Sequence, residues 1–345
     1  MNEINDGRAQ EPACTAVAAV GLNAACGVVV IGRNEGERLK RCLRSLPASD
    51  APLVYVDSGS TDASVPMAEL SGATVVDLDL SLPFTAARAR NAGFQRLCAI
   101  HPKLAFVFFV DGDCEVDSGW LVAASKFLQS HPGAAAVCGR LRERHPERSV
   151  YNRLCELEWN AAVGEVRSCA GIVVMRAAAF HAVGGFRDDL IAGEEPELCV
   201  RLRKAGWSIW RITTEMALHD AALTHFAQWW KRAQRGGHAF AEGAHLHGKP
   251  PEQYGVREVR RALLWGLAAP AGLFMLAMID VRWLWLTLAY PAQVLRLTWK
   301  LQTNGKPDVA RAFFMVLARF AEASGVVKFH WNRLLRRRTA LIEYK

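Results

Sequence analysis

The stretch that most constrains the fold of this chain is residues 106–113, whose sequence is FVFFVDGD. Its first five residues are apolar and mostly β-branched or aromatic, which predicts a strand buried on both faces of a sheet. The strand ends in Asp111 and Asp113, separated by a single glycine. Ligands of open α/β sheets bind beyond the carboxyl ends of the strands, and two acids there suit a hard divalent cation that also holds a diphosphate. Taken alone, the same residues also fit a solvated acidic turn.

The segments around this stretch alternate between strand and helix patterns. The other expected strands are residues 27–31, 53–57, 74–76, 134–137, 171–175 and 208–212. Residues 140–149 are highly charged and are expected to form an exposed loop. The alternation predicts an α/β fold with a wound, mostly parallel sheet flanked by helices. The turn after the first strand lacks a G-x-G-x-x-G pattern, which argues against a dinucleotide site, and Asn34 in that turn is expected to cap the next helix.

Composition narrows the classes of partner. The net charge of +8 would suit nucleic acid, anionic lipid or a phosphorylated substrate. The positive charge concentrates toward the C-terminus around apolar stretches, and there is no zinc-finger spacing or RNA-binding motif, so we expect no nucleic-acid partner. The nine cysteines include no Cys-x-x-Cys pair, which predicts reduced core residues in a cytosolic compartment. The first residues lack the pattern of an export signal, and we expect a poorly ordered lead-in there.

The C-terminal third is the most apolar part of the chain. Residues 263–279 carry no charge, and residues 283–295 carry none before Arg296. The first segment is at the low end of the length needed to span a bilayer, and the second is shorter. Residues 309–329 are apolar but place Arg311, Arg319 and Glu322 along one face, which suits a helix lying in a membrane interface. The alternative is that the two apolar segments form a buried helical hairpin of a soluble protein.

The charges around these segments predict an orientation. Arginines at 257, 260 and 261 precede the first apolar segment, and Arg296 and Lys300 follow the second. The positive-inside rule then places both outer ends on the cytoplasmic face of a bacterial inner membrane. The basic run 336–338 and the preceding domain would lie on that side, where anionic head groups are found. The expected divisions are a lead-in (1–26), an α/β domain (27–242), a linker (243–258) and a membrane-associated helical region (259–345).

Six short motifs carry a family resemblance. They are residues 28–35, DSGSTD at 57–62, ARARNAG at 87–93, DGD at 111–113, GGF at 184–186 and GEEPELCVR at 193–201. Their order resembles that of the family 2 glycosyltransferases over about two-thirds of the chain, residues 27–236. The resemblance implies a GT-A fold, a nucleotide-diphosphate sugar donor such as a UDP-sugar, and a divalent metal, Mg²⁺ or Mn²⁺.

The resemblance also implies roles on the metal side. Asp113 would hold the metal, and Asp111 would lie near the ribose, with a second possible role on the metal. His219, just after the last expected strand, would be a third ligand, although a lone histidine is as often structural. A metal held by these residues would neutralise the charge that develops on the leaving diphosphate.

Four further residues are implied on the nucleotide side. Arg33 and Glu35 follow the first strand, where this family contacts the nucleoside. Asp57 resembles the acid that accepts a hydrogen bond from the nucleobase, with a turn cap as the alternative. Arg90 matches the arginine before Asn-x-Gly and would stabilise the nucleotide.

The acid pair Glu194 and Glu195 matches the position of the family's catalytic base, which takes the proton from the acceptor hydroxyl. The second acid is glutamate here, where the family usually has aspartate. We expect Glu195 to be the base, with Glu194 as the alternative, and we expect the nearby helix N-terminus to favour its ionised form and limit its strength. A third interpretation is that both acids only cap the helix that begins near Pro196. One base opposite one leaving group implies a single displacement with inversion.

The segment after His219 bears on processivity and on the acceptor. Gln228–Arg232 lies where processive relatives carry Gln-x-x-Arg-Trp, but the spacing differs, so we expect one sugar to be added per event. Arg232 or Arg235 would contact the diphosphate. His245 and His247 fall in the predicted linker and are expected to be exposed.

The sequence therefore predicts transfer of a sugar from a nucleotide-diphosphate sugar to a saccharide acceptor, one attached to lipid, as in cell-envelope or exopolysaccharide synthesis. A sugar-phosphate nucleotidyltransferase would share the sheet and the acids, but residues 32–38 are a poor match to its glycine-rich basic loop. A non-catalytic membrane scaffold on the same fold would be expected to have lost the acids that this chain keeps.

Overall fold

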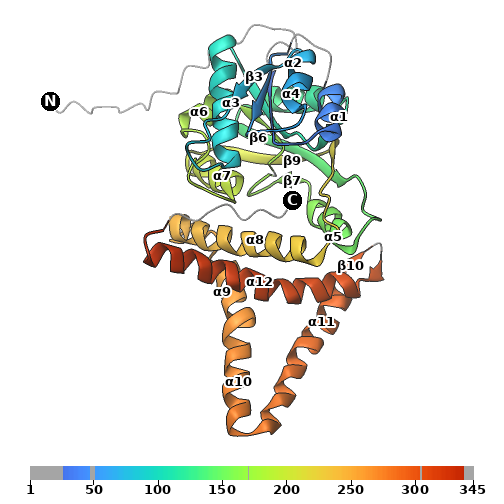
Figure 1. The fold of residues 1–345 in the computed structure, drawn as a ribbon, viewed down its shortest axis with the longest axis vertical. Helices are drawn as coiled ribbons and strands as arrows, with labels where there is room; N and C mark the ends of the chain where they lie inside the picture. Colours follow the sequence, from blue (N-terminus) through green and yellow to red (C-terminus); the bar gives the residue numbers. More distant parts are fainter. Residues whose placement is uncertain (1–25, 47–50, 170, 304, 338–345) are drawn as a thin grey trace, which may run out of the picture.

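The computed structural model describes residues 26–46, 51–169, 171–303 and 305–337. The predicted lead-in and Arg338 lie outside the described residues, except that Cys26 already belongs to the first strand. The described chain forms an α/β domain above a layer of long helices, from which a helical hairpin projects (Figure 1).

The sheet of the α/β domain is mixed, and its order is β3-β2-β1-β4-β8-β6-β9-β5, with β7 pairing to β9. The strands are β1 (Cys26–Gly32), β2 (Leu53–Asp57), β3 (Thr74–Asp77), β4 (Phe106–Asp111), β5 (Cys114–Val116), β6 (Ala134–Glu143), β7 (Gly164–Glu165), β8 (Val173–Arg176) and β9 (Ser208–His219). β1 to β4 run parallel, as the alternating pattern predicted. β8 is antiparallel to both β4 and β6, while β6 and β9 are parallel. This arrangement confirms the predicted α/β, GT-A-like architecture.

Helices cover both faces of the sheet. They are α1 (Glu37–Ser45), α2 (Ser64–Leu70), α3 (Ala86–Ile100), α4 (Trp120–Ser130), α5 (Val150–Trp159), α6 (Ala177–Ala182) and α7 (Glu194–Lys204). β4 shows why residues 106–110 are apolar without interruption. Phe106 and Phe108 pack into the core that contains Leu39 of α1, and Phe109 packs into the opposite core beside Phe180. Successive side chains of a strand point to opposite faces, so a strand in the middle of the sheet needs apolar residues at every position.

Two local predictions were wrong. Asn34 does not cap α1: the N-cap is Gly36, and Asn34 adopts φ 54° while its Oδ1 accepts a hydrogen bond from the Thr61 N–H at 2.7 Å. Asparagine tolerates this left-handed conformation, so it serves the turn instead of the helix. The charged segment expected to be a loop from residue 140 is strand as far as Glu143, because its arginines point outward while Leu141 and Glu143 point inward.

The C-terminal part begins with α8, which lies alongside the last helix, α12 (Figure 1). Its elements are α8 (Phe226–His247), α9 (Val256–Leu263), η1 (Leu264–Ala268), α10 (Ala269–Ile279), η2 (Val281–Leu288), α11 (Ala289–Lys300), β10 (Gln302–Thr303), β11 (Lys306–Pro307) and α12 (Val309–Leu334). The predicted start of the linker at residue 243 is therefore wrong, because α8 continues to His247. Its apolar and aromatic residues pack on α12, so α8 belongs with the helical layer.

The contact between α8 and α12 depends on glycines. A Cβ at Gly237 would lie 2.1 Å from the carbonyl oxygen of Glu322, and one at Gly325 would lie 2.0 Å from that of Gln234. Only glycine permits such a close backbone approach. Glu322 is buried at this contact and pairs with Arg319 at 2.7 Å, so it is not part of an exposed charged face as predicted.

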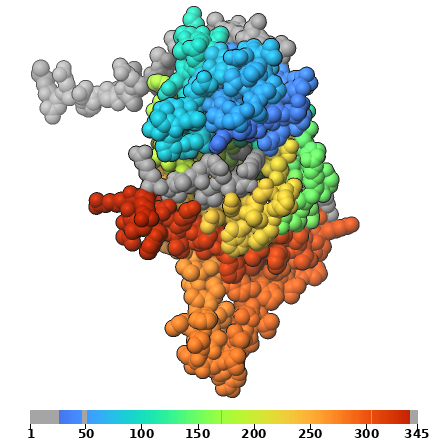
Figure 2. Space-filling view, viewed as in Figure 1, coloured from blue at the N-terminus to red at the C-terminus, as the bar shows by residue number. Residues whose placement is uncertain are grey.

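The hairpin formed by residues 264–297 is exposed along its length. None of these residues is buried, and Figure 2 shows the two limbs protruding from the body of the molecule. The exposed side chains include Phe274, Met275, Met278, Ile279, Trp285 and Leu288, with exposed fractions between 61% and 81%. The alternative of a buried hairpin is therefore wrong. Of the described helices, one is long and apolar enough to cross a membrane by length and composition, the continuous helix Val256–Ile279.

Candidate active site

Asp113, Cys114 and His219 form a cluster of possible metal ligands where β4 leads into β5. Their ligand atoms all lie within 4.8 Å of one another, because Cys114 and His219 are paired across β5 and β9. Asp113 Oδ1 lies 3.3 Å from His219 Nε2 and 3.5 Å from Cys114 Sγ. His219 Nδ1 is buried and has no hydrogen-bond partner among the described residues. A carboxylate oxygen suits Mn²⁺ or Mg²⁺, an imidazole nitrogen suits a transition metal such as Mn²⁺ but not Mg²⁺, and a thiol suits softer metals, so Asp113 and His219 fit Mn²⁺ while only Asp113 fits Mg²⁺.

Arg90 of α3 joins the carboxyl end of β4 to the start of α7. Its Nη2 donates to Asp111 Oδ1 at 2.7 Å, and its Nη1 donates to Glu194 Oε1 at 2.7 Å. Only 3% of Arg90 is exposed. Burial alone would lower the pKa of Arg90, but the two carboxylates raise it above its ordinary value, so the guanidinium stays charged. Asp111 is thus held by an arginine and is not in the metal-ligand cluster, and its second possible role on the metal stays a prediction.

The turn after β2 packs against the turn after β1. Both oxygens of Asp57 accept hydrogen bonds within the protein, Oδ1 from the Tyr55 hydroxyl at 3.0 Å and Oδ2 from the Gly59 and Ser60 N–H groups at 2.9 and 2.7 Å. The turn-cap interpretation of Asp57 therefore holds, and base recognition would use its remaining lone pairs. Glu35 lies beside the acidic turn that follows β4. A Cβ built on Gly112 of this turn would lie 3.3 Å from the Cγ of Glu35. Arg33 is exposed at the same edge of the sheet.

Glu195 is buried at the start of α7. Its Oε1 accepts hydrogen bonds from the Cys169 N–H at 2.6 Å and from Cys199 Sγ at 2.8 Å, and only 3% of the residue is exposed. α7 is preceded by Gly193 in the left-handed conformation, without a side-chain cap, so the capping interpretation is wrong. Burial raises the pKa of Glu195 to about 7, although the two hydrogen bonds lower it. The helix N-terminus was expected to favour the ionised form of Glu195 and limit its strength as a base, whereas the largest effect on its pKa is desolvation, which acts in the opposite direction.

Glu194 and Glu195 line a cavity of about 360 Å³ between β6, β9 and the start of α7, together with Trp159 and Arg211. Glu158 also lines it and binds Arg232 of α8, at 2.8 Å between Nη1 and Oε2. Arg232 therefore lies beside this cavity. Arg235 lies near His238, and the diphosphate role proposed for either arginine stays a prediction.

A second set of ion pairs, which the sequence did not indicate, ties α8 to α7. His247 Nε2 lies 2.9 Å from Oε1 of the buried Glu197, which also pairs with Arg201 at 2.7 Å. His247 is thus not a free, exposed linker residue as predicted, whereas His245 is exposed. Arg203 at the end of α7 pairs with Glu252, in the segment that follows α8. No spacing pattern along the chain reveals such pairs, because the partners are about 50 residues apart.

Comparisons with known proteins agree with this geometry. Residues 27–174 match the sequence model described as glycosyl transferase family 2. A search of curated protein sequences gave no match. Among solved structures, the chain is similar to the mannosyltransferase PcManGT from Pyrobaculum calidifontis in complex with GDP-Man and Mn²⁺, with a TM-score of 0.63, 19% identity, and coverage of 90% of this chain and 88% of that one.

A second similar structure is S. aureus TarS 1–349 in complex with UDP-GlcNAc, with a TM-score of 0.50 and 13% identity over 90% of this chain and 92% of that one. At these identities the likeness concerns the fold, and it extends well beyond the residues that the family model matches. Residues 27–174 thus match a family 2 glycosyltransferase domain, and the described chain has the GT-A-like fold of the similar structures.

Proposed function

We propose that this chain transfers a single sugar, with inversion, from a nucleotide-diphosphate sugar such as a UDP-sugar to a lipid-linked saccharide at the cytoplasmic face of a membrane. The observation that carries the proposal is the Arg90 bridge. Its guanidinium contacts both Asp111, two residues before the metal-type ligand Asp113, and Glu194, the neighbour of a buried acid whose pKa is raised. Donor-side and acceptor-side groups are thereby held in one site.

Asp113 and His219 are the residues that would hold a divalent metal. When bound, the ion would supply positive charge against the leaving diphosphate. The proximity of Asp111 and Glu35 at the same strand ends supports a nucleoside site beside it. Arg90 orients Asp111 by its hydrogen bond, so the carboxylate keeps one defined position at the mouth of the sheet.

Glu195 is proposed as the general base. A base whose pKa lies near the working pH combines a useful ionised fraction with strength as a proton acceptor. Glu195 meets this condition, whereas Glu194 is engaged in an ion pair with Arg90 at 2.7 Å. Removal of the proton from the acceptor hydroxyl by one carboxylate, opposite the leaving nucleotide, gives a single displacement and hence inversion.

The raised pKa of Glu195 gives an expected pH profile. The base must be ionised to accept a proton, so kcat should fall by about tenfold for each pH unit well below 7 and level off above it. Initial rates at saturating donor and acceptor from pH 5 to pH 9 would measure this. A profile that stays flat down to pH 5 would contradict the assignment of Glu195.

The reaction class can be tested with a panel of nucleotide sugars that includes UDP-sugars and GDP-mannose. Purified protein with Mn²⁺ is expected to release a nucleoside diphosphate slowly from one donor, because water can replace the acceptor. A nucleotidyltransferase would instead release diphosphate from a nucleoside triphosphate and a sugar phosphate, and a scaffold would do neither. Product analysis by chromatography therefore separates the three interpretations.

The hairpin supports membrane attachment. Its exposed residues include Phe274, Met278 and Trp285, at exposed fractions of 66%, 73% and 61%. Exposing so many contiguous apolar side chains to water is unfavourable, and a lipid environment removes that cost. Arg257, Arg260 and Arg261 of α9 directly precede the hairpin, where they would meet the phosphate groups of the cytoplasmic leaflet.

Membrane attachment predicts that the full-length protein remains in the membrane fraction after carbonate extraction. Replacing Phe274 and Met275 together with lysine should move most of it to the soluble fraction, because each charge in the bilayer centre costs about 3 kcal/mol. Lysine at Leu70 and Leu80, which are 89% and 58% exposed on the catalytic domain, is the matched control and should change nothing. Wild-type protein in the soluble fraction without detergent would contradict the topology and the inferred acceptor.

A further inference from the structure

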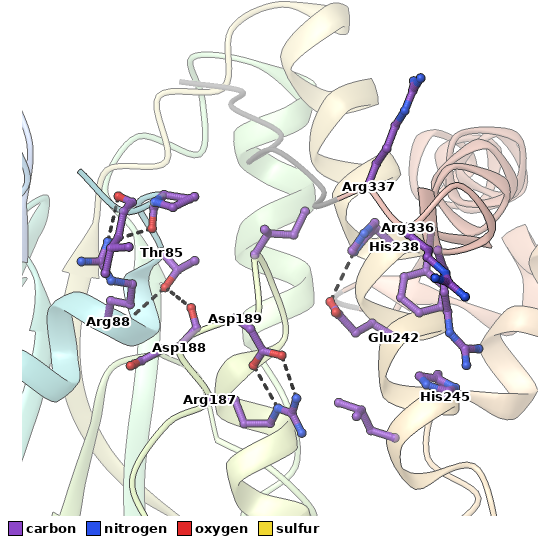
Figure 3. A pocket seen from close by; sticks show the side chains of 16 residues that line it. Thr85, Arg88, Arg187, Asp188, Asp189, His238, Glu242, His245, Arg336 and Arg337 are labelled. Atoms are coloured by element: carbon purple, nitrogen blue, oxygen red, sulfur yellow. Dashed lines mark hydrogen bonds and ion pairs between the residues drawn. The ribbon is translucent and has the colours of Figure 1, made fainter. Parts of the chain in front are cut away.

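A large cavity lies between the catalytic domain and the helical layer (Figure 3). Its volume is about 760 Å³. On one side it is formed by the turn before α3 and by residues 187–191, which precede α7. On the other side it is formed by α8 and the end of α12. Five arginines line it, namely Arg88, Arg187, Arg333, Arg336 and Arg337.

The carboxylates that line this cavity leave a surplus of positive charge. There are three of them. Asp189 is paired with Arg187 at 2.7 Å, and Asp188 accepts a hydrogen bond from the Asn91 side chain at 2.7 Å. Glu242 is the third, and burial followed by the charge of Asp189 raises its pKa to about 7, so it is only partly ionised at neutral pH. Fewer negative charges than arginines therefore face the cavity.

Three of the five arginines have no carboxylate partner among the described residues. Arg333, Arg336 and Arg337 make no ion pair with any carboxylate in the described part of the chain. Arg88 is held in position by hydrogen bonds to the carbonyl oxygens of Leu82, Pro83 and Asp79, at 3.0, 2.8 and 2.9 Å, and its charge is partly compensated by the nearby carboxylate of Asp79. Guanidinium groups on opposite walls of one cavity suit an anion with several oxygens, such as a phosphate.

His238 provides an independent observation. It lines the cavity, only 1% of it is exposed, and neither ring nitrogen has a hydrogen-bond partner among the described residues. Its Nδ1 lies 3.6 Å from Glu242 Oε2, too far for a hydrogen bond (Figure 3). Burial, Lys328 and Arg235 lower its pKa to about 4, so the imidazole is neutral and offers one N–H. A buried polar group without a partner is costly unless a ligand satisfies it.

We propose that this cavity binds the phosphate or diphosphate group of a membrane-anchored acceptor; this inference rests on the proposed function. The position supports it. Residues 187–191 run directly into Gly193 and the acid pair, and a Cβ on Gly193 would lie 3.1 Å from that of Ala239, the neighbour of His238. An anion held here therefore lies next to the segment that carries Glu195. Arg333 of α12, and Arg336 and Arg337 just after this helix, lie at the end of the helical layer from which the apolar hairpin projects, and a membrane-anchored phosphate would approach from that layer.

The test compares two double variants of the full-length protein in neutral detergent micelles. R336Q/R337Q removes two charges from the cavity, and R96Q/R148Q removes two from exposed positions of the catalytic domain. The probes are dodecyl phosphate, inorganic phosphate and phosphatidylglycerol vesicles, with UDP and Mn²⁺ as a separate titration. We expect R336Q/R337Q to weaken dodecyl phosphate binding at least about tenfold, since charge-assisted hydrogen bonds are lost, and R96Q/R148Q to leave it unchanged.

The other outcomes overturn the inference in distinguishable ways. Equal dodecyl phosphate affinity in both variants shows that the cavity is not the site. Equally tight binding of inorganic phosphate shows a site for a soluble anion. If R336Q/R337Q weakens only the binding of phosphatidylglycerol vesicles, Arg336 and Arg337 contact the bilayer surface and do not bind a phosphate in the cavity. Absence of UDP binding in the wild-type protein would instead count against the proposed function.

Discussion

Replacing Asp113 with asparagine is expected to abolish metal-supported binding of a nucleoside diphosphate, with a loss of affinity of at least about a hundredfold. Asp113 is the one carboxylate in the described cluster with Cys114 and His219, and an amide oxygen carries no charge to hold a hard cation. The two side chains have nearly the same shape, so the thermal transition should change little. Calorimetric titration of UDP with and without Mn²⁺ measures the effect.

Cys114 supplies a control within the same cluster. Because a buried thiol is a poor ligand for Mn²⁺ or Mg²⁺, Cys114→Ala should bind UDP with Mn²⁺ about as well as the wild type. His219→Gln should fall between the two variants, since an imidazole nitrogen is a weaker contributor than a carboxylate for this type of ion. An unchanged manganese-dependent affinity in Asp113→Asn would show that the metal, if used, is held elsewhere.

The second large effect is expected for Glu195→Gln. It should lower turnover by about two to four orders of magnitude, the usual contribution of a positioned base. The amide keeps an oxygen that can accept from the Cys169 N–H at the start of α7, so the fold and donor binding should be retained. Steady-state kinetics together with UDP titration separate the loss of a base from the loss of a site.

Three further variants sharpen this result. Glu194→Gln should be less impaired, unless the roles of the two acids are exchanged. Glu195→Asp tests the reach of the carboxylate, because the family usually has aspartate at this position. Glu147→Gln, an equal change of charge at an exposed residue, should have wild-type turnover. If neither member of the acid pair lowers turnover when changed, the base lies elsewhere.

The parts of the fold that the sequence predicted are those governed by local periodicity. The run at residues 106–110 could only be a central strand, because both faces of β4 are covered by packed side chains such as Phe108 and Phe109. The position of Asp57 and Asp111 at one edge of the sheet was predictable in the same way, because the carboxyl ends of parallel strands lie at the same edge. The proximity of His219 to Asp113, at 3.3 Å, was implied by the family resemblance and not by periodicity, since the expected last strand ended at residue 212 and β9 continues to His219.

The contacts between distant residues were not predictable in this way. Arg90 and Glu194 are 104 positions apart, and nothing in either local pattern shows that one guanidinium contacts both Asp111 and Glu194. The pKa of Glu195 depends on how completely its neighbours exclude water. The position of Glu195 at the start of a helix does not indicate how deeply the side chain is buried. Nothing in the sequence distinguishes Cys114 from an ordinary core residue, because free cysteines are usually buried as small apolar side chains.

The ion pairs between α7 and α8 have a consequence for which acceptors can be used. His247 and Glu197, with Arg203 and Glu252, fasten the helix that carries Glu195 to the helical layer from which the hairpin projects. With the hairpin in a bilayer, the base would stand at one fixed height above the lipid phosphates. The enzyme would then be selective for the length of its acceptor. It would glycosylate acceptors whose reactive hydroxyl reaches that height. Saccharide chains that are one or two sugars shorter or longer would present no hydroxyl to Glu195.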